Sequence, residues 1–158
     1  MAVVYPSPLL VSCDSPQNYR GQGGVEFLRN IPTVWDESVV VSGEVAKSIV
    51  VARRAGRRWY LAAMSGEGAA ELSVPLSFLR TGAWTLRAFA DQPDGSDYQA
   101  VVESTRAVEP GSVLPLSLAP GGGFAGIISQ ARPALIDARG TRTQHDAKSV
   151  KSPRSRAP

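Results

Sequence analysis

Short strand-like stretches recur about every 8–14 residues between residues 33 and 129, and turn signals separate them. Ala55-Gly56-Arg57 predicts a short hairpin, and Pro93-Asp94-Gly95 is a strong turn signal. The stretches are SIVVARR, RWYLAAM, AELSVPL, AWTLRAFA, DYQAVVEST, SVLPLSL and GFAGII. No convincing helix lies between them, and parallel pairing would need longer crossovers. The sequence therefore predicts an all-β fold, an antiparallel β-sandwich, for residues 33–129.

Residues 1–32 have a different texture from the strand series. The apolar start MAVVY predicts a buried strand, and the spacing of Val25, Leu28 and Ile31 predicts a short helical turn that ends before Pro32. The start lacks a basic region and two prolines interrupt it, so we expect no signal peptide here. No run reaches the roughly 18 apolar residues that would span a membrane.

Residues 130–158 carry most of the positive charge of the chain. They contain seven Lys or Arg residues and two Asp residues, which gives this segment a net charge of +5. Since the whole chain has a net charge of +3, residues 1–129 have a net charge of −2. Val150 is the only large apolar residue after Ile136. Such a segment buries too little apolar surface to offset the entropy of ordering, and we predict a basic disordered tail.

In the stretch LAPGGGFAG, three of the four glycines, Gly121, Gly123 and Gly126, have the spacing of a dinucleotide-binding loop. Such a loop must follow a parallel strand and open a helix whose N-terminus holds the pyrophosphate. Here Pro133 follows too soon for a full helix. We therefore interpret the glycines as a turn between the last two strands, where a missing Cβ permits unusual dihedral angles or close backbone contact.

The stretch IPTVWDES offers two adjacent carboxylates, Asp36 and Glu37. Glycoside hydrolysis needs two carboxyl groups about 5–10 Å apart that face each other across the scissile bond. Neighbouring residues on a strand point to opposite faces, so this pair is a poor acid/base couple. We expect a turn at the entry to the domain instead, with Trp35 as a packing anchor.

The sequence offers few residues for a nucleophilic catalytic site or a metal site. The single histidine, His145, lies in the basic tail, so Cys13 has no structured histidine base, and no Ser-His-Asp set is available in the ordered part. One cysteine and one histidine also exclude a zinc site built from these residue types. The sequence predicts no catalytic residue and no metal site.

Arginines and aromatic residues suggest two binding hypotheses. Four arginines surround one hairpin next to Trp59 and Tyr60, which is compatible with nucleic-acid binding but more typical of a solvated hairpin tip. These arginines are Arg53, Arg54, Arg57 and Arg58. Trp59, Tyr60 and Trp84 are possible carbohydrate contacts if their rings are exposed, although a core position is the more ordinary one for each tryptophan.

Several stretches together resemble the C-terminal end of glycoside hydrolase family 97, bacterial enzymes that cleave α-glucosides or α-galactosides. They are VVYPSPLLVSCDSPQNY, EFLRNIPTVWDES, VVVARRAGRRWYLAAM, LSVPLSFLRTGAWTLRAFADQPDG and LSLAPGGGFAG, and they run in family order over about residues 1–128. The resemblance implies a fragment of a longer enzyme. Residues 1–32 would be a remnant of the last strand and helix of a catalytic (β/α)₈ barrel, and residues 33–129 the C-terminal β-sandwich domain.

The resemblance also implies what this chain lacks. The family's catalytic carboxylates and calcium ligands lie upstream of everything here, so we expect the chain alone to be inactive. The expected partner is the catalytic barrel of the parent enzyme, with Trp35 at the domain interface, and we expect no nucleic-acid or membrane partner. A full-length bacterial parent would be periplasmic or secreted.

Two further expectations remain to be tested. The alternative function is a free-standing carbohydrate-binding module, which would need exposed aromatic rings. If MAVVY is a strand without its usual neighbours, it invites aggregation, and a chain starting near Ile31 should be more soluble than the whole chain.

Overall fold

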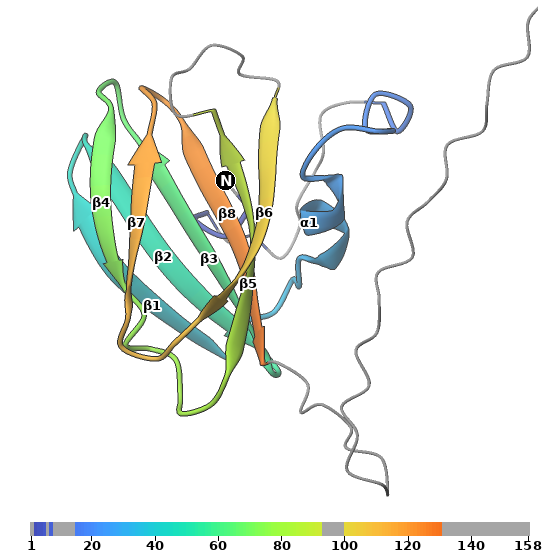
Figure 1. Cartoon of the computed structure of the whole chain (residues 1–158). Helices are drawn as coiled ribbons and strands as arrows, with labels where there is room; N and C mark the ends of the chain where they lie inside the picture. The colour runs from blue at the N-terminus through green and yellow to red at the C-terminus, as the bar shows by residue number, and fades with distance from the viewer. Residues whose placement is uncertain (1, 6, 8–14, 93–99, 131–158) are drawn as a thin grey trace, which may run out of the picture.

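The computed structural model describes residues 2–5, 7, 15–92 and 100–130 (Figure 1). One short helix, α1 (Val25–Asn30), precedes the strands β1 (Glu37–Glu44), β2 (Ser48–Ala55), β3 (Arg58–Ser65), β4 (Ala70–Pro75), β5 (Trp84–Asp91), β6 (Val101–Val108), β7 (Val113–Leu118) and β8 (Gly123–Gln130). No helix in the described ranges is both long enough and apolar enough to cross a bilayer. The tail from residue 131, Pro93-Asp94-Gly95, Cys13 and His145 lie outside the described residues.

The strands form two antiparallel sheets. The larger has the order β1-β2-β3-β8-β5-β6, and β4 pairs with β7 in the smaller. Gly56, with a φ of 57°, makes the predicted hairpin turn between β2 and β3. The prediction of an all-β domain is confirmed, because every strand pair is antiparallel and only one short helix is present in the described part of the chain.

The sequence analysis missed strand β1. Its register with β2 shifts between Val40 and Ser42, which marks a β-bulge at this edge of the sheet. Val39 and Val41 both pack against the central core, whereas Val40 between them is exposed. Because residues 39–41 are all valine, this alternation in burial does not appear as an alternation of apolar and polar residues in the sequence, and the partly buried Ser42 after the bulge disturbs it further.

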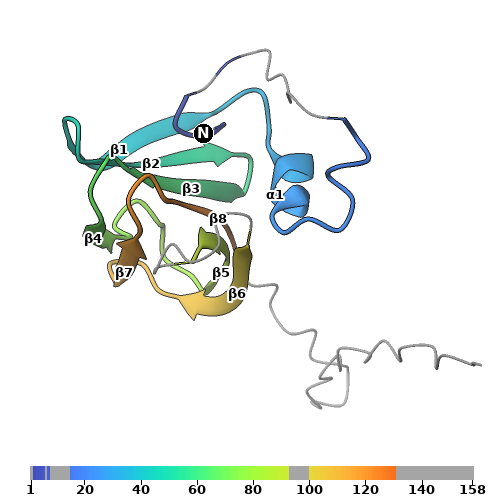
Figure 2. The ribbon, with the colours of Figure 1, turned by 90° about the horizontal axis from the view of Figure 1, so that it is seen from above.

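The main core lies between the two sheets. Strand β7 shows why: Leu114, Leu116 and Leu118 are buried, while the residues that alternate with them are exposed. A strand with one face on the core and one in solvent produces this pattern. Seen from above, β4 and β7 lie on one side of the larger sheet and α1 on the other (Figure 2).

The outer face of the larger sheet carries a second apolar cluster, built by the N-terminal residues and the sheet together. Its buried members are Val3, Val4, Phe27, Tyr60, Ala62 and Phe89. We refer to these residues as the outer cluster. The larger sheet is therefore covered on both faces, by β4 and β7 on one side and by residues 2–5 and α1 on the other.

The predicted strand at MAVVY is wrong, although its burial is confirmed. Residues 2–5 form a turn that lies against the sheet, with Val3 only 1% exposed. A short apolar run indicates burial, but periodicity cannot distinguish its backbone conformation. The predicted helical turn is confirmed as α1, which buries Phe27 rather than Leu28.

Candidate functional site

The two candidate carboxylates bind the same arginine. Asp36 Oδ2 lies 3.2 Å from one terminal nitrogen of Arg54, and Glu37 Oε2 lies 3.1 Å from its Nε. Asp36 also accepts a hydrogen bond of 2.7 Å from the backbone N–H of Gly56. The carboxylates thus tie the start of β1 to the β2–β3 turn.

Our expectation that these two side chains point to opposite faces is wrong. Asp36 precedes β1, which begins at Glu37, so the alternation of a strand does not apply to it. Asp36 and Glu37 still make a poor acid/base couple, because both carboxylates bind Arg54 instead of facing each other across a cleft. In the described residues, no group of three or more His, Cys, Asp or Glu side chains is placed to hold a metal ion.

The glycine run forms a turn and the start of the last strand. Residues 119–122 connect β7 to β8, and Gly121, with a φ of 67°, donates a hydrogen bond to the carbonyl of Gly66 at 2.6 Å. The strand that follows excludes the helix that a dinucleotide loop requires. Gly126 serves packing, because a Cβ there would lie 2.7 Å from Leu86 Cδ1.

The possible carbohydrate contacts are all buried. Trp59 and Trp84, 3% and 5% exposed, lie in the core between the sheets, and Tyr60, 3% exposed, lies in the outer cluster. None of these rings presents a face on which a sugar could stack. Trp35 is partly buried and contacts Tyr60 edge-on, with 5.3 Å between ring centroids.

Three of the hairpin arginines have partners within the chain. Arg53 donates to the carbonyl of Val3 at 2.6 Å, Arg54 binds the two carboxylates, and Arg57 donates to Gln130 Oε1 at 3.0 Å. These interactions point the side chains towards neighbouring segments. The hairpin is therefore chiefly a site of internal contacts.

Three side chains of the sheet hold residues 2–5 and α1 against its outer face. Besides Arg53, which binds the carbonyl of Val3, Tyr60 donates through its hydroxyl to the carbonyl of Asn30 at 2.8 Å. Arg87 forms an ion pair of 2.8 Å with Glu26 of α1. The outer face with these contacts is the candidate functional site, because it binds the preceding segment of the chain to the sheet.

Arg87 also binds Glu103 of β6 at 3.1 Å, and its guanidinium lies 5.1 Å from the ring centroid of Phe89. Its hydrogen bond and charge hold the pKa of Glu26 below the usual 4.5, and the two carboxylates raise the pKa of Arg87. Sequence reasoning missed this group, since its members come from three separate elements. The only available signal was an arginine inside an otherwise apolar strand.

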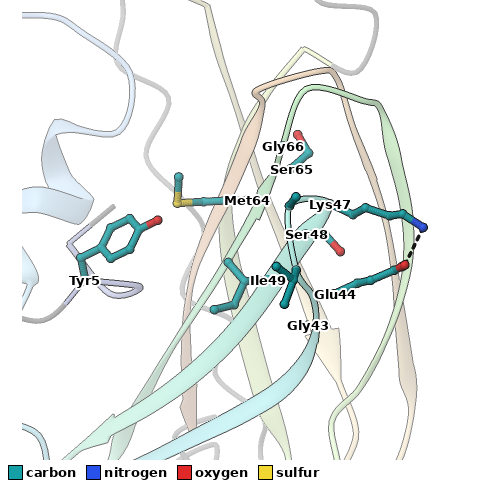
Figure 3. A pocket seen from close by; sticks show the side chains of 11 residues that line it. Tyr5, Gly43, Glu44, Lys47, Ser48, Ile49, Met64, Ser65 and Gly66 are labelled. Atoms are coloured by element: carbon teal, nitrogen blue, oxygen red, sulfur yellow. Dashed lines mark ion pairs between the residues drawn. The ribbon is translucent and has the colours of Figure 1, made fainter.

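A shallow hollow of about 380 Å³ lies where residues 2–5 meet the β1–β2 hairpin (Figure 3). Tyr5, Ile49 and Met64 give it an apolar wall, whereas the Lys47–Glu44 ion pair lies on the other side of the hairpin. Tyr5 is 62% exposed. This hollow extends the apolar surface beyond the part that the N-terminal residues cover.

Comparison with known proteins places most of the described chain in one family. Residues 34–129 match the family described as glycosyl-hydrolase 97 C-terminal, oligomerisation. This range contains β1 to β7 and all of β8 except its last residue, Gln130, and it excludes α1 and residues 2–5.

Two curated relatives are similar over most of this chain. A retaining alpha-galactosidase of Bacteroides thetaiotaomicron is 40% identical over 128 residues, which cover 78% of this chain and 19% of that protein. A probable retaining alpha-galactosidase of Streptomyces bingchenggensis is 31% identical over 134 residues, 84% of this chain and 20% of that protein. The chain thus spans about a fifth of the length of these relatives.

Solved structures agree with these relatives. A glycoside hydrolase family 97 enzyme from Pseudoalteromonas sp. strain K8, in complex with acarbose, is similar with a TM-score of 0.61 and 28% identity, over 68% of this chain and 18% of that one. A beta-arabinopyranosidase is similar with a TM-score of 0.59 and 29% identity, over 72% and 18%. The chain therefore belongs to glycoside hydrolase family 97, where it corresponds to the C-terminal oligomerisation domain, an accessory part of these enzymes.

Proposed function

We propose that this chain is the C-terminal part of an enzyme that cleaves α-galactosides or α-glucosides, and that it supports the catalytic barrel of that enzyme. The names of the two curated relatives favour α-galactosides and a retaining mechanism. The observation that carries the proposal lies on the outer face of the larger sheet. There, residues of the matched range 34–129, such as Tyr60, bind residues that come before this range, such as Asn30.

The preceding residues supply the link to the barrel in this proposal. In this proposal residues 1–32 correspond to the end of the barrel, although residues 2–5 form a turn here and only α1 is regular, and residues 33–129 correspond to the accessory domain. We assign Trp35 to the junction, because its ring contacts Tyr60 in the outer cluster. Burial of apolar surface at roughly 25 cal/mol per Å² holds the two parts together.

We place the calcium ion of the parent enzyme outside this chain. A calcium site needs about six to eight oxygen ligands, several of them carboxylates. The described residues offer no group of three or more potential ligands, and Asp36 and Glu37 are both bound to Arg54. These residues do not fit the ion, and no step of hydrolysis is assigned to them.

An activity assay tests the absence of catalysis. The purified chain should show no turnover of aryl α-galactosides or α-glucosides above background. Asp36→Asn and Glu37→Gln are the matched variants, since these two carboxylates are adjacent in the sequence and bind the same arginine. The proposal would be contradicted if the chain hydrolysed these substrates and either substitution abolished that activity.

A chimaera tests the supporting role. Residues 34–130 of this chain would replace the corresponding segment of the B. thetaiotaomicron relative, which should keep its activity. Trp35→Ala in that chimaera should lower its thermal stability, with Val45→Ala, which removes a 97% exposed side chain, as the control. Equal melting temperatures for the two variants would show that Trp35 does not stabilise the interface.

A carbohydrate-binding module is not favoured. Calorimetry with maltooligosaccharides and galactosides should show no heat of binding, because Trp59, Tyr60 and Trp84 are all buried. The partners that we propose are the barrel and a second copy of the chain, rather than nucleic acid or a membrane.

A further inference from the structure

The free edges of the two sheets differ in how they are protected against pairing. The described sheets end at β1 and β6 in one case and at β4 and β7 in the other. Strand β1 has a bulge after Val40, β4 ends with Pro75, and β7 contains Pro115. Bulges and prolines are common devices that keep an edge strand from pairing with another chain.

Strand β6 has neither device. It pairs with β5 without interruption from Val101 to Val108, so its backbone is regular over eight residues. Its six residues 102–107 are all exposed, and Val102 remains 47% exposed. In Figure 1, β6 (yellow) is the last strand of the larger sheet. A long, regular and exposed edge is a template for another strand.

We propose that β6 of this chain pairs antiparallel with β6 of a second copy and joins the two larger sheets into one. This inference rests on the self-association included in the proposed function and identifies its surface. The strand lies inside residues 34–129, which match a family whose description names oligomerisation. Part of the outer face of the same sheet is covered by Val3, Val4 and α1 and is not open to a second copy, whereas the exposed residues of β6 are.

Charge limits the register of this pairing. Two antiparallel edges related by a two-fold axis perpendicular to the sheet place the residue on the axis opposite its own copy. An axis at Glu103 or Arg106 would place like charges directly opposite each other, which is destabilising. Among the remaining positions, Ser104 and Thr105 lie at the middle of β6, so an axis at either one pairs the most residues of the two strands, and their hydroxyl groups can hydrogen-bond to their own copies.

Cysteine crosslinking of the full chain tests the register. In a Cys13→Ser background, Ser104→Cys and Thr105→Cys would each be oxidised, or treated with a short bismaleimide, and the covalent dimer measured. One of the two should crosslink several-fold more than the other, because only the residue on the axis faces its own copy. Val40→Cys at the β1 edge is the control and should give only background dimer.

Charge repulsion tests the surface independently of the register. Ser104→Lys/Thr105→Lys should raise the dimer dissociation constant by about ten-fold or more in sedimentation, since it sets ammonium groups against each other. The matched control, Val40→Lys/Ser42→Lys, adds the same charges to the β1 edge and should leave dimerisation unchanged. Thermal unfolding of each variant shows that it is folded.

The outcomes separate the two proposals. A chain that dimerises, but whose dimer is neither crosslinked through β6 nor weakened by the β6 lysines, would overturn the β6 pairing and keep self-association. A crosslink from β6 to another segment, identified by mass spectrometry, would also overturn the symmetric pairing. A chain that is monomeric at every concentration would overturn both.

Discussion

Phe27→Ala tests whether residues 2–31 and the sheet form one cooperative unit. Phe27 is the buried residue of α1, only 7% exposed, and its ring packs against Tyr60 and Phe89 with 6.3 and 5.7 Å between centroids. Removing this ring deletes the largest apolar contact between the helix and the outer face. Leu28→Ala is the control on the same helix, because Leu28 is 48% exposed.

The expected magnitude follows from burial. A buried phenylalanine replaced by alanine costs about 3–5 kcal/mol, which includes the cavity that it leaves. For a unit of this size that loss lowers the melting temperature by roughly 10–15 °C. The half-exposed Leu28 should cost about 1 kcal/mol or less. If the helix detaches before the sheet unfolds, the loss in free energy of unfolding cannot exceed the free energy with which α1 docks on the sheet.

Two measurements distinguish these cases. Urea unfolding, followed by tryptophan fluorescence, reports the global loss, and trypsin cleavage after Arg29 reports detachment of α1. Phe27→Ala should show a lower midpoint, faster cleavage, or both, relative to Leu28→Ala. The reasoning is refuted if the two variants have the same unfolding midpoint and the same rate of cleavage, because the helix would then contribute nothing through its buried face.

Three further predictions follow from the same contacts. A chain that starts at Ile31 should be less soluble than the whole chain, since it uncovers the outer cluster; better solubility in a centrifugation assay would restore our original expectation. Gly126→Ala should lower stability by about 1–3 kcal/mol in urea unfolding, because its Cβ would lie 2.7 Å from a buried leucine side chain. Gly68→Ala, with open space around it, should not. Arg87 holds the pKa of Glu26 below its unfolded value, so the stability that this pair contributes is present above about pH 4.5 and is lost as the pH falls through the folded pKa. This loss of stability in acid, followed as the urea unfolding midpoint against pH, should be absent in Arg87→Met.

The strands were predictable because local signals mark them. Gly56 allows the turn between β2 and β3, and the alternation in β7 reflects one buried and one solvated face. Strand β1 was missed because residues 39–41 are all valine, so its alternation in burial has no counterpart in the apolar and polar pattern of the sequence. Local patterns thus predicted strands where the sequence itself displays the alternation or the turn.

The order of the strands could not be predicted in this way. Strand β8 lies between β3 and β5, so the last strand pairs with two strands that precede it by many residues. The ion pairs of Arg87 depend on that arrangement, because Glu26 and Glu103 approach it from α1 and β6. No pattern within one element contains the information that places such groups together.

One signal of the covered outer face was nevertheless present in the sequence. Strand β3 reads RWYLAAMS, and its residues from Trp59 to Ala63 are all buried, whereas β7 alternates. A continuous apolar strand indicates a sheet that is buried on both faces. The smaller sheet covers only one face of β3, so a second cover was required by the sequence of β3 itself. Residues 2–5 and α1 provide it, although the family match begins only at residue 34. The match therefore marks where the sequences are similar, whereas the residues that cover the second face of β3 begin earlier in the chain.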